Sequence, residues 1–153
     1  MDIAKIKNRY FRKYSFKVRI EKTILSLLIL CIGGLIYIVF RDKSLLMFIW
    51  FNHLGLTQHI DTFRSLFNSD GVYGWVKNSL PDGLWLFAYM FLVDAIWNGS
   101  KSIRSNIFIY YLPFLALMSE FLQYFGLVPG VFDWIDVASY LLAILLYISL
   151  KLI

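Results

Sequence analysis

Five polar side chains in the second half of the chain have types and spacings that could bind a positively charged group. Glu120 and Gln123 are three positions apart, so on a helix a carboxylate and an amide lie on one face. Asp133 and Asp136 have the same spacing after a short loop, and Asp82 lies in an earlier apolar segment. Carboxylates that gather in one place attract a cation, a proton or a polar headgroup. Whether these five gather depends on the elements that carry them.

The composition indicates that those elements lie in lipid. Of the 153 residues, 59% are apolar and 19% aromatic. Charged residues make up 16%, whereas an average soluble domain has about 25%. So few polar residues cannot cover a soluble protein, which argues against a soluble enzyme. The single cysteine, Cys31, excludes a disulfide framework and a cysteine metal site.

Four apolar segments are long enough to cross a membrane as helices. Crossing about 30 Å of hydrocarbon takes about 20 residues. The segments that meet this length are 23–40, 79–97, 105–125 and 132–150. The first lacks the cleavage site of a secretory signal, so we expect it to be retained. We predict an all-α, polytopic membrane protein that forms a single membrane domain with four transmembrane helices.

Residues 1–22 form a basic arm that predicts the orientation of the chain. They hold eight of the fifteen Lys and Arg residues, and basic residues near helix ends stay in the cytoplasm. With the N-terminus inside, we count eleven basic residues on the cytoplasmic side and four outside, so we expect both termini to be cytoplasmic. Charge concentrated at one end is not typical of a nucleic-acid-binding face, and we expect no nucleic-acid partner.

The arm also has a helical pattern of its own. Apolar residues recur every three or four positions, at Ile3, Ile6, Tyr10, Tyr14 and Val18. This spacing predicts an amphipathic helix whose basic faces lie on the anionic cytoplasmic leaflet. Contact with a cytoplasmic partner or with RNA is the alternative.

The outer connection, 41–78, contains a further apolar run at 45–56. Twelve residues cannot span, so we predict a short interfacial or re-entrant helix there, with Trp50 among the residues at the headgroup level. His53 and His59 are six positions apart and do not share a helical face, which argues against a metal site. No motif for a cofactor or a catalytic nucleophile is present, so we expect no cofactor.

With these boundaries the five polar residues meet as an acidic mouth on the outer side. Glu120 is fifteen positions beyond Ser105, which is about 22 Å along a helix from its cytoplasmic end. Asp133 and Asp136 begin the last helix, and Asp82 begins the second at the same level. Capping is the alternative for Asp82 and Asp133, since carboxylates stabilise helix starts. For Glu120, the alternative is a buried strut to a neighbouring helix.

Two further features concern helix packing. Asp94 is an acid inside an apolar segment, where such groups are costly. It approaches the cytoplasmic end of the second helix, so we predict that it snorkels or pairs with Lys101 or Arg104. In the first helix, Gly33-Gly34 predicts close approach of a neighbouring helix.

The last third of the chain resembles the VanZ-like family of small bacterial integral membrane proteins. That family carries Glu-x-x-Gln, a short loop and then Asp-x-x-Asp at the start of the last helix. Here these motifs read Glu120-Phe-Leu-Gln123 and Asp133-Trp-Ile-Asp136. Gly130 stands where the family usually has Arg, so the carboxylates lack their usual counter-charge, and Tyr140 replaces the usual Asn. The resemblance implies a place in the bacterial cytoplasmic membrane. The family's namesake is associated with glycopeptide-antibiotic resistance, and most members have no established activity.

Two functions are open at this point. The first is an envelope protein that binds a membrane lipid or cell-wall headgroup, or a cation, at the acidic mouth. The second is a membrane-anchoring or pore-forming subunit, whose partner is another copy of the chain or a different membrane or cytoplasmic protein. No residue pattern points to a reaction, and we lean against an enzyme.

Overall fold

The computed structural model describes residues 3–67, 71–98, 100 and 102–152, with side chains described for residues 16–67, 71–98, 100 and 102–151. The described part of the chain contains six helices and no strand. Four helices are long and apolar enough to cross a membrane, over Phe16–Phe40, Gly74–Ile96, Ile103–Tyr124 and Trp134–Lys151. The predicted all-α class with four helices of spanning length is therefore confirmed.

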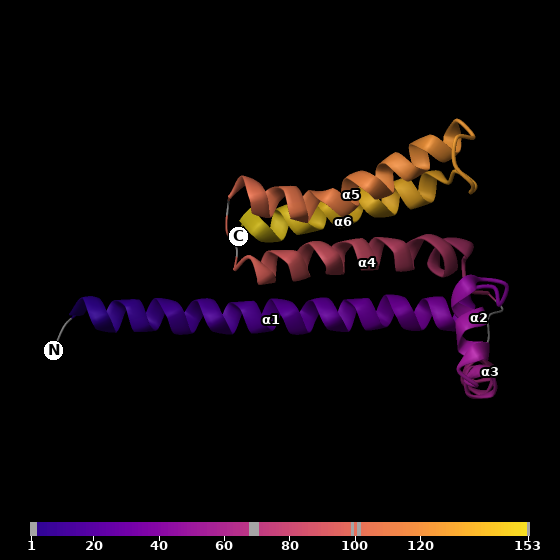
Figure 1. The fold of residues 1–153 in the computed structure, drawn as a ribbon, viewed down its shortest axis with the longest axis horizontal. Coiled ribbons are helices and arrows are strands. Elements are labelled where there is room, and N and C mark those ends of the chain that lie inside the picture. The colour runs from indigo at the N-terminus through magenta and orange to yellow at the C-terminus, as the bar shows by residue number, and fades with distance from the viewer. Residues whose placement is uncertain (1–2, 68–70, 99, 101, 153) are drawn as a thin grey trace.

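The helix boundaries differ from the predicted ones mainly at helix starts. Helix α1 (Ile3–Phe40) begins in the basic arm and continues without a break into the first apolar segment (Figure 1). Helix α4 (Gly74–Ile96) begins five residues before the predicted start at residue 79. Helices α5 (Ile103–Tyr124) and α6 (Trp134–Leu152) match the predicted segments within two residues at either end. The side chains of residues 3–15, with most of the predicted amphipathic stripe, lie outside the described part.

Helix α4 lies at the centre of the bundle. α1 runs along one side of α4, and the α5–α6 pair runs along the other (Figure 1). Among the described helices α1 packs only on α4 and on the short helix α3 (Thr57–Ser65), and makes no contact with α5 or α6. Half of the apolar window of α4 is buried, more than in any other long helix. The remaining apolar surface faces outward, as it does in proteins whose solvent is lipid.

Small residues allow the helices to approach α4 closely. A Cβ atom on Gly33 would lie 2.7 Å from the Trp85 indole, so this position of α1 has room only for hydrogen. Gly34 has nothing within 4 Å, so the predicted packing role holds for the first glycine of the pair alone. On the opposite side of α4, a Cβ on Gly83 would lie 3.1 Å from Ser139 of α6. Close approach through small residues is a common way to hold helices together in lipid.

The connection between α1 and α4 forms two short helices at one end of the bundle. Helix α2 (Leu46–His53) runs across the direction of α1, and α3 packs beside it (Figure 1). The apolar run at 45–56 is therefore a helix followed by a turn, in which Gly55 adopts a φ of 70°. The residue types of Asn68-Ser69-Asp70-Gly71 also predict a turn, but this stretch falls largely outside the described part.

Candidate functional site

Glu120 is buried near the end of α5 and faces the start of α6. Its side chain is 5% exposed, and its Oε2 accepts a hydrogen bond from the backbone N–H of Asp133 at 3.4 Å. The inward direction predicted for Glu120 is thus what the structure has. A donor–acceptor distance of 3.4 Å is long for such a bond, so the carboxylate keeps capacity for a further donor. We call this end of the bundle, where α1 ends and α6 begins, the Glu120 end.

Asp133 and Asp136 occupy the first turn of α6 and differ in their partners. Asp133 Oδ1 accepts from the backbone N–H of Ile135 at 2.8 Å, which is the geometry of an N-cap. The capping interpretation is therefore confirmed for Asp133. Asp136 Oδ1 is buried and has no hydrogen-bond partner among the described residues. A buried carboxylate oxygen without a donor is costly, so this atom favours a donor from outside the chain.

Asp82 belongs to the same group of acids but does not cap a helix. Because α4 begins at Gly74, Asp82 lies inside it, and the predicted Ser79-x-x-Asp82 capping pattern is wrong. The charges of Glu120 and Asp136 act on the Asp82 carboxylate, which places the three acids at one end of the bundle. We call Asp82, Glu120, Asp133 and Asp136 the carboxylate cluster.

Arg41 supplies a counter-charge that the sequence did not reveal. It follows directly after α1, and its Nη2 lies 3.9 Å from Asp82 Oδ2. Its Nη1 donates to Asn78 Oδ1 at 3.2 Å, whereas its buried Nε has no hydrogen-bond partner among the described residues. Tyr140 also lies within electrostatic reach of the cluster. The position of Arg41 directly after an apolar segment was the only sequence signal for this contact. That position does not indicate which acid Arg41 contacts.

Gln123 does not join the carboxylate cluster by any described hydrogen bond. Its Nε2 contacts Ser119 Oγ at 3.4 Å, and its carboxamide packs against the loop that precedes α6. A Cβ on Gly130 would lie 2.6 Å from this carboxamide, and Gly130 has a φ of 140°, a conformation that L side chains rarely adopt. The position where the VanZ-like family usually has Arg therefore has neither the room nor the backbone conformation for one here.

A second polar group lies at the opposite end of the bundle, which we call the Asp94 end. Asp94 is 2% exposed, and its Oδ2 lies 2.5 Å from Lys22 Nζ of α1. Its Oδ1 accepts from the Tyr147 hydroxyl at 3.2 Å and lies 3.9 Å from Lys151 Nζ, both of α6. Asp94 is thus buried instead of snorkelling. Its charged partners are these two lysines and not Arg104, and the other predicted partner, residue 101, lies outside the described part.

Apolar side chains separate the two polar groups. Along α4, the buried Leu86, Ala88 and Met90 lie between Asp82 and Asp94. Met90 belongs to the apolar core that also contains side chains from α5 and α6. The described residues therefore offer no continuous polar path from one end of the bundle to the other.

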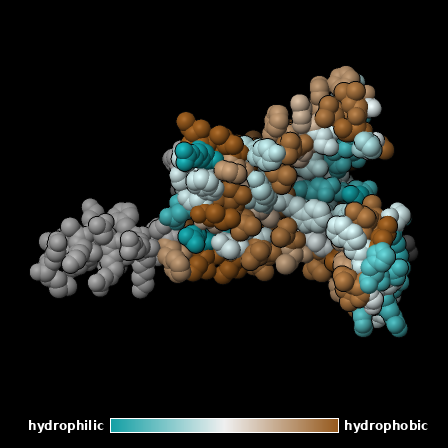
Figure 2. Space-filling view, viewed as in Figure 1, coloured by the Kyte–Doolittle hydropathy of each residue, from teal (hydrophilic) through white to brown (hydrophobic). Residues whose placement is uncertain are grey.

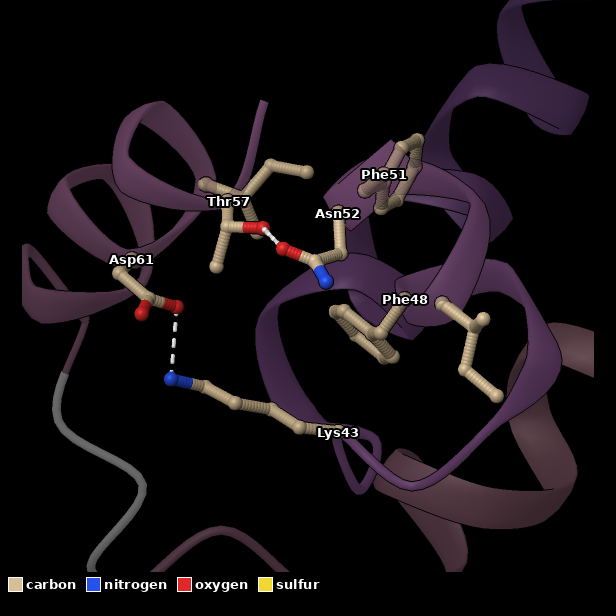
Figure 3. Close-up of a pocket in the computed structure, with 8 residues that line it drawn as sticks. Lys43, Phe48, Phe51, Asn52, Thr57 and Asp61 are labelled. Carbon is tan, nitrogen blue, oxygen red and sulfur yellow. Dashed lines mark hydrogen bonds and ion pairs between the residues drawn. The ribbon is translucent and has the colours of Figure 1, made fainter. Parts of the chain in front are cut away.

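A small pocket lies between α2 and α3, beyond the carboxylate cluster. Figure 3 shows Lys43 reaching across it to Asp61, with 2.6 Å between Nζ and Oδ1. Phe48 and Phe51 form part of its apolar wall. Its volume of about 260 Å³ is below the range of about 300–1,000 Å³ typical of ligand pockets. We interpret it as the seam that holds α2 on α3.

Figure 2 shows how polarity is distributed over the surface. Hydrophobic residues cover much of the sides of the bundle, and hydrophilic residues gather in a recess at the Glu120 end, between the α5–α6 connection and the α2–α3 pair. Among the described residues, no group of three or more His, Cys, Asp or Glu side chains is arranged to hold a metal ion. The carboxylate cluster is therefore a set of separate carboxylates and not one chelating centre.

No protein-family model, curated protein or solved structure matches this chain. The geometry of the two polar groups is therefore the guide to function.

Proposed function

We propose that this chain is an integral protein of the bacterial cytoplasmic membrane that binds a lipid or cell-wall headgroup through a cationic part of that headgroup. The binding site is the carboxylate cluster. The observation that carries the proposal is the buried, unpartnered Oδ1 of Asp136, which lies within electrostatic reach of Asp82 beside Glu120. An external donor would satisfy this oxygen.

The charge of the cluster favours the same ligand. The ion pairs of the described residues give these four carboxylates one basic neighbour, Arg41, whose Nη2 lies 3.9 Å from Asp82 Oδ2. Uncompensated charge at the end of a bundle of apolar helices is costly. A primary ammonium carries three N–H donors, which can point to separate carboxylates. This suits acids that are spread over three helices better than a metal ion does, because the ligands of a metal ion must converge on one point.

The location in the envelope is supported by two sequence features. The Glu-x-x-Gln and Asp-x-x-Asp motifs that resemble the VanZ-like family supply Glu120, Asp133 and Asp136 of the cluster. The basic arm favours an N-terminus inside, which puts the Glu120 end on the outer side of the membrane. Headgroups of the outer leaflet and of cell-wall precursors lie at that level.

The alternative is a membrane-anchoring or pore-forming subunit. Among the described helices, α1 packs only on α4 and α3, and 17% of its apolar window is buried, so a partner in the membrane has surface to contact. The apolar core between the two polar groups disfavours a pore through a single copy. Any pore would have to form between copies.

Glu120→Gln separates these functions, because it keeps the size of the side chain and removes the charge. We expect purified Glu120→Gln protein in nanodiscs to bind phosphatidylethanolamine about tenfold more weakly, a loss of about 1.4 kcal/mol. Phosphatidylethanolamine whose amine has been acylated should bind weakly to wild type and variant alike. Native mass spectrometry measures both.

The matched control is Glu21→Gln, the same substitution at an exposed position midway along α1, at the level of the Asp94 end. It should bind phosphatidylethanolamine as wild type does. Unchanged binding by both Glu120→Gln and Asp136→Asn rules the headgroup proposal out. If Glu120→Gln instead changes the number of copies in the particle, the subunit function is favoured.

A further inference from the structure

A second, basic pocket adjoins the carboxylate cluster at the Glu120 end. Its volume is about 610 Å³, within the range of about 300–1,000 Å³ that is typical of ligand sites. It lies between the end of α1, the linker that follows, α3 and the start of α4. The lining residues are Phe40, Arg41, Asp42, Lys43, Leu45, Arg64 and Asn78. Three cations therefore face one carboxylate.

The guanidinium groups of the pocket have donors to offer. Arg41 Nε is buried without a described hydrogen-bond partner, and the 3.9 Å between its Nη2 and Asp82 is longer than a hydrogen bond. Arg64 uses one of its five donors on the backbone carbonyl of Ile38, at 2.6 Å, and its guanidinium lies over the Phe48 ring. Two arginines whose orientation is fixed in this way suit the tetrahedral oxygens of a phosphate.

Lys43 and Asp42 do not cancel this positive charge. Lys43 pairs with Asp61, but both side chains are about half exposed, and such a pair contributes little and can be exchanged for another anion. Asp42 Oδ1 accepts from the backbone N–H of Ser44 at 2.7 Å, which lowers the pKa of the Asp42 carboxyl, as does the charge of Arg64. Asp42 therefore stays ionised and offsets one of the three cations. The pocket keeps a net positive lining.

Arg41 joins the pocket to the carboxylate cluster. It lines the pocket and lies 3.9 Å from Asp82, while its partner Asn78 lines the pocket as well. An anion in the pocket and a cation in the cluster would therefore lie on either side of one guanidinium. The end of a spanning helix is also the level at which lipid phosphates occur.

We infer that the basic pocket binds the phosphate group of the same headgroup whose ammonium binds the carboxylate cluster. The ligand class is then an amine-bearing phospholipid of the phosphoethanolamine type. The ammonium half of this inference rests on the proposed function, whereas the phosphate half rests on the pocket alone. A free phosphate has the same chemistry, so the test includes both sources.

The test compares three probes in nanodiscs of neutral lipid, which are phosphatidylethanolamine, phosphatidylglycerol and inorganic phosphate. We expect the double variant Lys43→Gln/Arg64→Gln to bind both phospholipids at least tenfold more weakly. Glu120→Gln should weaken phosphatidylethanolamine only, because phosphatidylglycerol has no amine. Arg104→Gln, which removes a basic charge from an exposed position at the Asp94 end, outside both the pocket and the basic arm, should change neither.

The outcomes separate the two proposals. If Lys43→Gln/Arg64→Gln binds both phospholipids as wild type does, the phosphate site is wrong, even where Glu120→Gln has its effect. If that double variant weakens both phospholipids and Glu120→Gln is silent, the phosphate site stands and the ammonium site fails. If the protein binds inorganic phosphate but neither phospholipid, the pocket is a phosphate site. The inference that its ligand is a lipid is then wrong.

A gain-of-affinity variant guards against misfolding, since Arg64 also supports the packing of α3. Asp42→Asn removes the one acid among the described lining residues and keeps an oxygen that can accept from Ser44. We expect Asp42→Asn to bind phosphatidylglycerol severalfold more tightly. Weaker or unchanged binding by a folded Asp42→Asn protein contradicts the phosphate site.

Discussion

The hydroxyl of Tyr147 donates to Oδ1 of Asp94 across the interior of the bundle, at 3.2 Å. Tyr147 is 1% exposed and Asp94 2%, so water does not compete for this hydrogen bond. Lys22 and Lys151 approach the same carboxylate from α1 and α6. One acid of α4 thus joins two helices that do not contact each other. This geometry indicates that Asp94 stabilises the packing of the bundle. Asp136 Oδ1 at the Glu120 end, by contrast, has no hydrogen-bond partner among the described residues.

Asp94→Asn should destabilise the bundle strongly, because it leaves two lysines facing an uncharged amide. Breaking a buried ion pair costs about 3–5 kcal/mol, and we expect about 3 kcal/mol because both lysines keep some exposure. Thermal unfolding in detergent measures the loss. Tyr147→Phe removes a single hydrogen bond and should cost about 1 kcal/mol.

A double-mutant cycle of Lys22 and Asp94 gives the control for Asp94→Asn. Lys22→Met destabilises the wild type because it breaks the ion pair with Asp94. In the Asp94→Asn background the same change should cost little, since the pair is already broken. Additive losses from the two substitutions would show that Lys22 and Asp94 act independently.

Gly33→Ala should weaken the packing of α1 on α4. The added methyl would lie 2.7 Å from the Trp85 indole, and overpacking of this kind typically costs about 1–3 kcal/mol. Gly34→Ala is the matched control, because nothing lies within 4 Å of its new methyl group. It should keep or raise the unfolding temperature, as alanine stabilises a helix by up to about 1 kcal/mol over glycine. Equal effects at the two positions would contradict the observed packing.

Asp133→Ala should loosen the first turn of α6, because it removes the oxygen that accepts from the Ile135 N–H. Loss of an N-cap costs about 1 kcal/mol. Asp133→Asn keeps an acceptor and should cost much less. Hydrogen exchange of the amides in the first turn of α6 reports the difference, and faster exchange in Asp133→Asn than in Asp133→Ala would exclude the cap.

The sequence was informative about features that depend on a single helix. Hydrophobic length located the four spanning helices because the distance across lipid is fixed. The residue types at the start of α6 allowed a cap at Asp133, which was the alternative to binding. The i, i+3 spacing put Glu120 and Gln123 on one helical face, but no described hydrogen bond joins Gln123 to the carboxylate cluster. The start of α4 was misplaced because polar residues such as Lys77 and Asn78 ended the apolar segment but not the helix.

The contacts between helices could not be read from the sequence. Asp94 was expected to meet Lys101 or Arg104, close neighbours along the chain. Its described charged partners are instead lysines of the first and last helices. Arg41 was counted only as an outer charge, although its contact with Asp82 connects the carboxylate cluster to the basic pocket. Such pairs depend on how the helices pack, and helical periodicity carries no information about which face meets which neighbour.

The orientation of the bundle can be tested with single cysteines in a Cys31→Ser background. Leu54 lies in the turn after α2 and is 70% exposed, whereas Ile103 begins α5 at the other end and is 79% exposed. With the N-terminus inside, a membrane-impermeant maleimide should label Leu54→Cys in intact cells. It should label Ile103→Cys only after the membrane is permeabilised.

The native Cys31 provides the control for this labelling. It is exposed in the structure but lies within the apolar part of α1, where the surrounding lipid should exclude a polar reagent in both conditions. The reverse pattern, with Ile103→Cys labelled first, would place the carboxylate cluster on the cytoplasmic side. Its ligand would then come from the inner leaflet, and a cell-wall headgroup displayed outside the membrane could not reach it.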